Sequence, residues 1–224
     1  MILDAVWRLK RRFAAAARAA PPGPLADFYA AGLADLGRAD TLLVALDLET
    51  DGLNAKDDHI LEFGLVGMTL TGIDLATAQR IRISPKAALR PETVVIHKIT
   101  DDAIAGAADE ATVLAQILPQ LAGRVLVAHF AQIEAAFLEA ACWRSFGAPF
   151  VAPFICTMQL ERRWFPATHR QDGLRLGHLR DRYNLPRYSA HDGLMDAIAC
   201  GEMLLAQIAR RNQPVARLDA LLRR

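Results

Sequence analysis

The feature that most constrains the fold is a short apolar run at 42–46 that leads directly into two acidic residues. A brief, uninterrupted apolar run is typical of a central strand that is covered on both faces of a sheet. Residues 125–128 form a second run of this kind. The pattern predicts further strands at 60–68, at about 78–84 and just before Cys156.

Helical periodicity occupies much of the remaining chain. Apolar residues recur at three- and four-residue intervals, which indicates helices packed on a core. We predict helices in the segment before the Pro21-Pro22-Gly23-Pro24 sequence and at 25–38, about 109–121, 131–145 and about 191–210. Three leading strands followed by alternating helices and strands indicate an α/β fold with a mixed sheet flanked by helices.

The predicted elements divide the chain into three parts. Residues 1–40 are interpreted as an N-terminal helical extension, because they are too few to bury a core of their own. Residues 41–210 form the main domain, and 211–224 form a C-terminal tail. The extension is a candidate docking surface for a protein partner, or simply a cover for the sheet.

Charge and cysteine content restrict the possible environments. The net charge is +1, but arginines gather at 8–18 and 161–187, where they either bind a phosphate backbone or lie solvated on helix faces. Three widely spaced cysteines predict buried apolar side chains in a reducing compartment. No apolar run reaches the roughly 20 residues that a membrane span needs. We therefore expect a cytoplasmic protein without a membrane segment.

Asp47 and Glu49 are the first candidate metal ligands. Residues two apart in a strand point to the same face, so both carboxylates project together from the end of a buried strand. Two like charges there are costly unless a cation neutralises them. Carboxylates suit hard ions such as Mg²⁺ or Mn²⁺. The alternative is a hydrogen-bonded Asp47, with Glu49 already in solvent.

Two later segments supply further candidates. Glu134 has apolar neighbours at helical spacing, which directs it inward, and an inward glutamate is unusual unless it is paired or bound to metal. Asp196 lies on the last predicted helix. His191 is expected at the junction before that helix, where an imidazole can take a proton from an attacking water. Taken singly, each residue is more often structural, with His191 as a helix cap and Asp196 as a partly exposed acid.

The order of these residues resembles that of the DEDDh exonucleases, which include the epsilon proofreading subunit of bacterial DNA polymerase III. The resemblance covers about 41–210 and rests on Asp47-x-Glu49, Glu134, His191-x-x-x-x-Asp196 and the intermediate sequence at 96–100. It implies a ribonuclease-H-like fold and two Mg²⁺ or Mn²⁺ ions. By that similarity Asp47, Glu49 and Asp196 are metal ligands and His191 is the general base.

The resemblance also implies a substrate, namely single-stranded nucleic acid with a free 3′ end that is shortened to nucleoside 5′-monophosphates. Candidate substrate contacts are Thr50, Leu53, His97 and Phe130. The family pattern has Asp at the position of Glu134 and Asn at that of Phe130. We interpret Glu134 as a longer ligand that serves the site directly or through water, and Phe130 as an added apolar wall.

Two other enzyme functions are disfavoured, and the more serious alternative is a binding domain without catalysis, which needs neither His191 nor three acids in this order. A nucleotide-binding ATPase would need a G-x-x-x-x-G-K-[ST] motif, which the chain lacks, and a phosphatase using an aspartate nucleophile would prefer Asp at position 49. A non-catalytic nucleic-acid-binding domain of the same fold is favoured by Glu134 and Phe130. We favour single-stranded DNA as the substrate, with RNA 3′ ends as the alternative.

Overall fold

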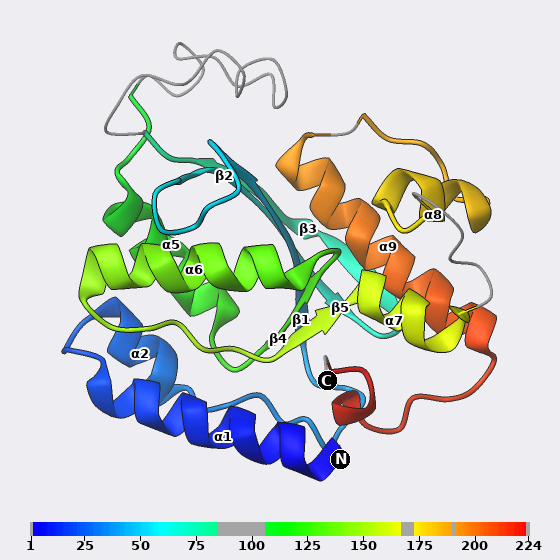
Figure 1. The fold of residues 1–224 in the computed structure, drawn as a ribbon, viewed down its shortest axis with the longest axis horizontal. Helices are drawn as coiled ribbons and strands as arrows, with labels where there is room; N and C mark the ends of the chain where they lie inside the picture. The colour runs from blue at the N-terminus through cyan, green and yellow to red at the C-terminus, as the bar shows by residue number, and fades with distance from the viewer. Residues whose placement is uncertain (1, 85–105, 167–172, 190, 223–224) are drawn as a thin grey trace.

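A mixed five-stranded sheet forms the centre of the molecule (Figure 1). The computed structural model describes residues 2–84, 106–166, 173–189 and 191–222. The strands follow the order β3-β2-β1-β4-β5, and β1 pairs antiparallel with β2 and parallel with β4. Their bounds are β1 Leu43–Thr50, β2 Ile60–Thr69, β3 Gly72–Arg82, β4 Val125–Ala128 and β5 Phe154–Cys156. The predicted α/β class, a mixed sheet flanked by helices, is therefore confirmed.

Helices cover both faces of this sheet. The helix α9 (Gly193–Arg211) crosses one face and contacts β1, β2 and β3. On the other face, α5 (Glu110–Leu121) and α6 (Ala131–Phe146) share an apolar core with β1 and β2. The remaining described helices are α1 (Ile2–Ala19), α2 (Pro24–Ala30), α7 (Thr157–Trp164), α8 (Leu176–Arg182) and the short 3₁₀ helix η2 (Leu218–Ala220).

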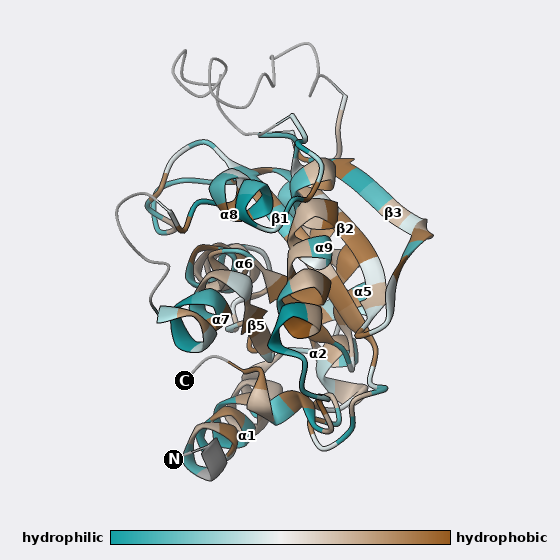
Figure 2. Cartoon of the chain, turned by 90° about the vertical axis from the view of Figure 1, so that its right-hand side faces the viewer, coloured by the Kyte–Doolittle hydropathy of each residue, from teal (hydrophilic) through white to brown (hydrophobic). Residues whose placement is uncertain are grey.

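The distribution of hydropathy explains this layering. Alternate residues of β1 divide between two apolar clusters, because successive side chains of a strand point to opposite faces. Figure 2 shows hydrophobic residues along β2 and hydrophilic residues on α7 and α8. Among the described residues, no helix is both long and apolar enough to cross a membrane. The three cysteines are free and buried, as predicted.

Two element boundaries differ from the sequence prediction. The helix predicted at 25–38 ends at Ala30, and Gly32 follows with a φ of +79°, a conformation that interrupts a helix and suits glycine. The third strand begins at Gly72, earlier than predicted. Its first half is largely exposed and lacks the alternating pattern of a half-buried strand.

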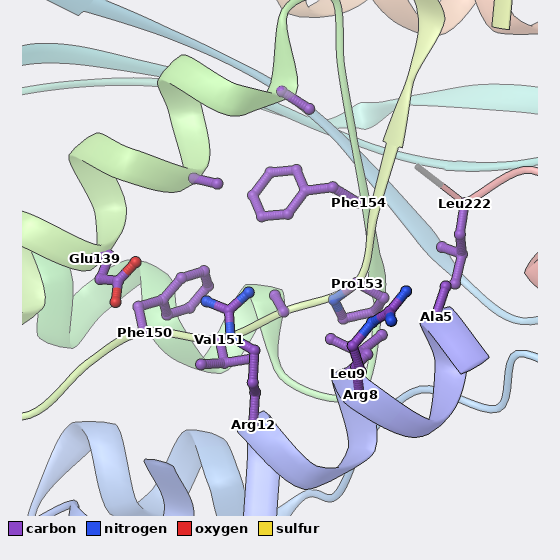
Figure 3. A pocket seen from close by; sticks show the side chains of 13 residues that line it. Ala5, Arg8, Leu9, Arg12, Glu139, Phe150, Val151, Pro153, Phe154 and Leu222 are labelled. Carbon is purple, nitrogen blue, oxygen red and sulfur yellow. The ribbon is translucent and has the colours of Figure 1, made fainter. Parts of the chain in front are cut away.

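The α1 helix closes the lower edge of the core in Figure 1. Phe13 packs edge-on against Tyr29 of α2, with 4.9 Å between ring centroids, and η2 contacts α1. A pocket of about 340 Å³ lies between α1, α6 and the chain leading into β5. Figure 3 shows Arg8, Arg12, Phe150 and Phe154 among the side chains that line this pocket.

The N-terminal end of α9 lies against β2. A Cβ added at Gly64 would stand 2.0 Å from the carbonyl oxygen of Gly193, so the two backbones are in direct contact. A Cβ added at Gly201, which lies two turns after Gly193 in α9, would stand 3.1 Å from Ile73 of β3. The close contact at Gly64 brings the first turn of α9 over the part of the sheet that carries Asp47 and Glu49.

Candidate active site

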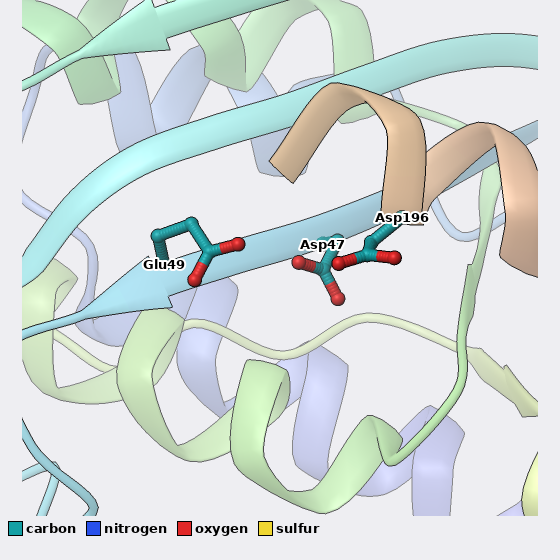
Figure 4. A group of neighbouring side chains, drawn as sticks. All are labelled: Asp47, Glu49 and Asp196. Atoms are coloured by element: carbon teal, nitrogen blue, oxygen red, sulfur yellow. The ribbon is translucent and has the colours of Figure 1, made fainter. Parts of the chain in front are cut away.

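Three carboxylates from two elements converge at this end of the sheet. Asp47 and Glu49 extend from β1, and Asp196 extends toward them from the first turn of α9 (Figure 4). Each offers a carboxylate oxygen, and these three oxygens lie within 4.8 Å of one another. Glu49 is buried inside the protein, so the alternative in which it had left the strand for solvent is wrong. Such a group can hold a divalent cation.

The electrostatics of the group favour a bound cation. Burial raises the pKa of Asp47 well above its ordinary value, and the charges of Glu134, Glu49 and Asp196 raise it further. Burial also raises the pKa of Asp196. Both shifts express the cost of placing several negative charges together in a poorly solvated place. A divalent cation would remove that cost.

Glu134 points into the interior from the first turn of α6. The same face of α6 carries Phe137 and Leu138, and these two residues and Glu134 are all buried. The inward direction predicted for Glu134 is therefore correct. Burial raises its pKa to about 7. Its Oε2 atom has no hydrogen-bond partner among the described residues. Glu134 lies outside the three-carboxylate group, although its charge acts on Asp47.

His191 lies just before α9, as its spacing from Asp196 predicts. It has a φ of +63°, and its backbone N–H donates a 2.8 Å hydrogen bond to Oδ2 of Asp196. Asp192 caps the helix by accepting a hydrogen bond from the N–H of Met195. The carboxylates of Asp192 and Asp196 therefore accept backbone hydrogen bonds from within this same segment. His191 itself is exposed.

A second charged group adjoins the carboxylates and was missed from the sequence. Glu62 of β2 pairs with Glu49 across the sheet and is buried. Arg82 and Arg80 of β3 both form ion pairs with it, at 2.9 and 3.4 Å. The available signal was a lone glutamate inside the apolar run at 60–68, facing two arginines two residues apart on the next strand.

One half-buried histidine belongs to the scaffold. His129 follows β4, and its two ring nitrogens lie 2.8 Å from the Thr157 hydroxyl and 2.7 Å from the Leu174 carbonyl. Burial lowers its pKa to about 4. With a neutral ring, Nε2–H donates to the carbonyl and Nδ1 accepts from the hydroxyl. The ring ties β4, α7 and the segment before α8 together.

The comparison with known families decides the classification of this chain. A family model described as an exonuclease, RNase_T, matches residues 44–204, which is more than half of the chain. The chain belongs to this exonuclease family. Every residue of the carboxylate group, together with Glu134 and His191, lies inside the matched range.

Curated relatives of this chain include DNA polymerase III proteins. The DNA polymerase III subunit epsilon of Treponema pallidum (strain Nichols) is 31% identical over 165 residues, which cover 74% of this chain and 75% of that protein. The PolC-type DNA polymerase III of Oceanobacillus iheyensis is 28% identical over 177 residues. That match covers 79% of this chain but only 12% of the polymerase.

Solved exonuclease structures share the fold. Exonuclease X in complex with 5′-overhanging duplex DNA aligns with a TM-score of 0.61 and 22% identity, over 80% of this chain and 98% of that one. The nuclease domain of 3′hExo, a DEDDh family member bound to rAMP, aligns with a TM-score of 0.66 and 16% identity, over 80% and 96% of the two chains. These likenesses establish the ribonuclease-H-like architecture of the exonuclease domain.

The predicted substrate contacts of this chain have different surroundings. Thr50 is buried, and its hydroxyl donates a 2.7 Å hydrogen bond to the Gly52 carbonyl. Leu53 is 84% exposed, and Phe130, which immediately precedes α6, is 41% exposed. His97 lies outside the described residues. The substrate roles of all four remain predictions.

Proposed function

We propose that this chain is a metal-dependent 3′→5′ exonuclease of the DEDDh class that acts on single-stranded DNA. It would hydrolyse the phosphodiester bond nearest the 3′ end and release nucleoside 5′-monophosphates. The convergence of Asp47, Glu49 and Asp196 is the observation that carries the proposal. Membership of the exonuclease family supports the same reaction class.

The donor set fits two divalent ions, Mg²⁺ or Mn²⁺. Asp47, Glu49 and Asp196 would hold them, and Glu134 would contribute directly or through water, since one of its buried oxygens has no hydrogen-bond partner among the described residues. Bound in pairs, such ions activate the attacking water and stabilise the leaving oxygen. The raised pKa of Asp47 supports this arrangement, because it reflects negative charge that the ions would offset.

His191 would accept the proton of the attacking water. Its exposure leaves the imidazole accessible, and the hydrogen bond from its backbone to Asp196 holds its main chain beside a proposed ligand. An imidazole accepts a proton readily near neutral pH, which suits a general base. The proposed metal ligand Asp196 and the proposed general base His191 therefore lie on one short segment of the chain.

DNA is favoured as the substrate by the relatives. The 31% identical relative is a DNA polymerase III subunit, and Exonuclease X was solved with DNA. Exposed apolar groups can hold unpaired terminal bases by stacking and wedging, which tolerates any sequence. Leu53 and Phe130 supply such groups, with Thr50 and His97 as further proposed contacts.

The test is release of mononucleotide from defined ends. Single-stranded DNA labelled at its 3′ terminus is incubated with the protein and Mn²⁺, beside an RNA oligonucleotide of the same sequence. We expect labelled nucleoside 5′-monophosphate from DNA, less from RNA, and a fall of at least about a hundredfold in Asp47→Asn. Metal-independent binding without release would favour the non-catalytic alternative. Faster release from RNA would reverse the proposed substrate preference.

A protein partner is proposed at the N-terminal helices. The relative in Treponema pallidum is a subunit of a polymerase. On α1, Trp7 is 55% exposed, with the Arg11 guanidinium 4.6 Å from its ring centroid. Exposed tryptophan and arginine are common at the centres of protein interfaces. Residues 1–40 are therefore the surface that we propose for such a partner.

A further inference from the structure

Arg80 connects the sheet to the beginning of α9. Its guanidinium forms an ion pair with Asp192, the residue that caps α9, and its Nε lies 3.4 Å from Oε1 of Glu62. Glu62 is buried, whereas Arg80 and Asp192 are partly exposed. One arginine thus bridges two acids from different elements, and one of these acids immediately follows His191.

The strand register explains why Arg80 can reach the helix. Asp47, Gly64 and Arg80 form one row across β1, β2 and β3. Gly64 carries no side chain, and the backbone of Gly193 occupies the space above it. Arg80 therefore flanks the first turn of α9 on one side, and Asp47 lies on the other. The next row is Glu49, Glu62 and Arg82.

This arrangement sorts the acids into two sets. Asp47, Glu49 and Asp196 face one another, whereas Glu62 and Asp192 share Arg80. A buried glutamate beside a metal site would otherwise add negative charge or compete as a ligand. The ion pairs neutralise it and use its charge to hold the helix.

We propose that Arg80 is a positioning residue of the exonuclease site. By bridging Glu62 and Asp192 it fixes the first turn of α9 on the sheet, and so holds Asp196 and His191 over Asp47 and Glu49. This inference rests on the proposed function for its catalytic part. Its structural part, the placement of Asp196, is measurable through metal binding alone.

The experiment measures Mn²⁺ affinity by calorimetry without nucleic acid, together with kcat and KM on single-stranded DNA. Residues that orient metal ligands typically contribute about 10–100-fold to affinity or activity, and we expect Arg80→Gln to lose that much in Mn²⁺ affinity and in kcat, with KM little changed. Arg80→Lys should recover part of the loss. Arg82→Gln is the matched control, since Arg82 pairs with Glu62 from the same strand.

A double-mutant cycle isolates the link to the helix. Asp192→Asn keeps an oxygen that can accept the Met195 N–H but removes the charge that pairs with Arg80. We expect Arg80→Gln/Asp192→Asn to lose no more Mn²⁺ affinity than Arg80→Gln alone. Additive losses, or equal losses in Arg80→Gln and Arg82→Gln, would overturn the proposal.

Two further outcomes distinguish the positioning role of Arg80 from a direct contact with nucleic acid and from a failure of the proposed function. If Arg80→Gln raises KM only and leaves Mn²⁺ affinity unchanged, Arg80 contacts nucleic acid and the positioning role is wrong. If the wild type binds Mn²⁺ but releases no nucleotide, the proposed function fails, and the affinity cycle still decides the role of Arg80. Thermal melting of each variant identifies any that fail to fold.

Discussion

At the scale of single residues, Glu134 raises the sharpest question about the site. It is buried, its Oε2 has no partner among the described residues, and it carries one methylene more than the aspartate of the family pattern. Mg²⁺ demands near-ideal octahedral geometry. If Glu134 serves the site as we propose, its extra methylene would make the site less suited to Mg²⁺ and would favour the more tolerant Mn²⁺.

We predict that Glu134→Ala lowers exonuclease activity by at least about tenfold, because a group that ligates or orients a metal is lost. Glu134→Asp should retain activity and raise the ratio of the Mg²⁺ rate to the Mn²⁺ rate. Rates on one oligonucleotide, with each metal in turn, check both statements. Full activity in Glu134→Ala would remove this residue from the site.

The pKa of Glu134 makes a separate prediction about stability without metal. Its folded value of about 7 exceeds the ordinary 4.5, so the folded state binds more protons between these pH values, and its contribution to stability falls as pH rises through them. Glu134→Gln carries no titratable side chain at this position. Measured in EDTA, the unfolding free energy of Glu134→Gln relative to wild type should rise between about pH 4.5 and 7, by a total on the order of 3 kcal/mol.

Comparing Glu134→Gln with the wild type removes the opposing pH dependence that His129 contributes to stability. The pKa of His129 is lowered to about 4, so its own contribution to stability rises with pH between about 4 and 6.5. That contribution is common to both proteins and cancels in their difference. Urea titrations at several pH values give the result, and a difference that stays flat with pH would contradict it.

The residues of the site were predictable to different degrees. Asp47 and Glu49 follow from strand alternation, and the inward direction of Glu134 follows from helical spacing, because both are local patterns. Glu62 and Arg80 were missed, since their meeting depends on how β2 and β3 are aligned. A shift of one residue in that register would have placed Arg80 on the opposite face.

At the scale of elements, the contact between α9 and β2 sets the geometry of the site. A Cβ at Gly64 would stand 2.0 Å from the Gly193 carbonyl oxygen and 2.1 Å from its carbon, both of them backbone atoms that cannot turn aside. Gly64→Ala must therefore push the start of α9 away from the sheet. Asp196 moves with it, away from Asp47 and Glu49.

We expect Gly64→Ala to lower the unfolding free energy by about 1–3 kcal/mol, the usual cost of overpacking, and to weaken Mn²⁺ binding. Gly72→Ala is the control, because a Cβ there meets no atom within 4 Å. Urea unfolding and Mn²⁺ calorimetry measure the two effects. Equal behaviour of the two variants would show that the helix does not rest on Gly64.

The elements themselves were predicted unevenly, for physical reasons. The strands β1 and β4 carry uninterrupted apolar runs, and the helices α6 and α9 carry apolar residues at three- and four-residue intervals. The structure places all four near the predicted bounds. The first half of β3 lies largely exposed at the edge of the sheet, where burial imposes no pattern on the sequence. The strand order depends on contacts between distant segments, so the local patterns did not specify it.

At the scale of the whole molecule, α1 has two surfaces with different consequences. Phe13 is 9% exposed and belongs to the same apolar cluster as β1, α5 and α6. Trp7, on the same helix, is 55% exposed. Phe13 therefore joins α1 to the core of the domain, while Trp7 remains available for the proposed partner.

We predict that Phe13→Ala lowers the unfolding free energy by about 3 kcal/mol, the usual cost of removing a buried phenylalanine side chain. Trp7→Ala should change it by less than about 0.5 kcal/mol, as is usual at the surface. Both folded variants should keep the kcat of the wild type, because neither residue lies in the carboxylate site. Urea unfolding and nucleotide release measure these effects. If the two substitutions cost the same stability, α1 is not packed on the core through Phe13. If Phe13→Ala lowers kcat without lowering stability, the packing of α1 on the core instead influences the geometry of the carboxylate site.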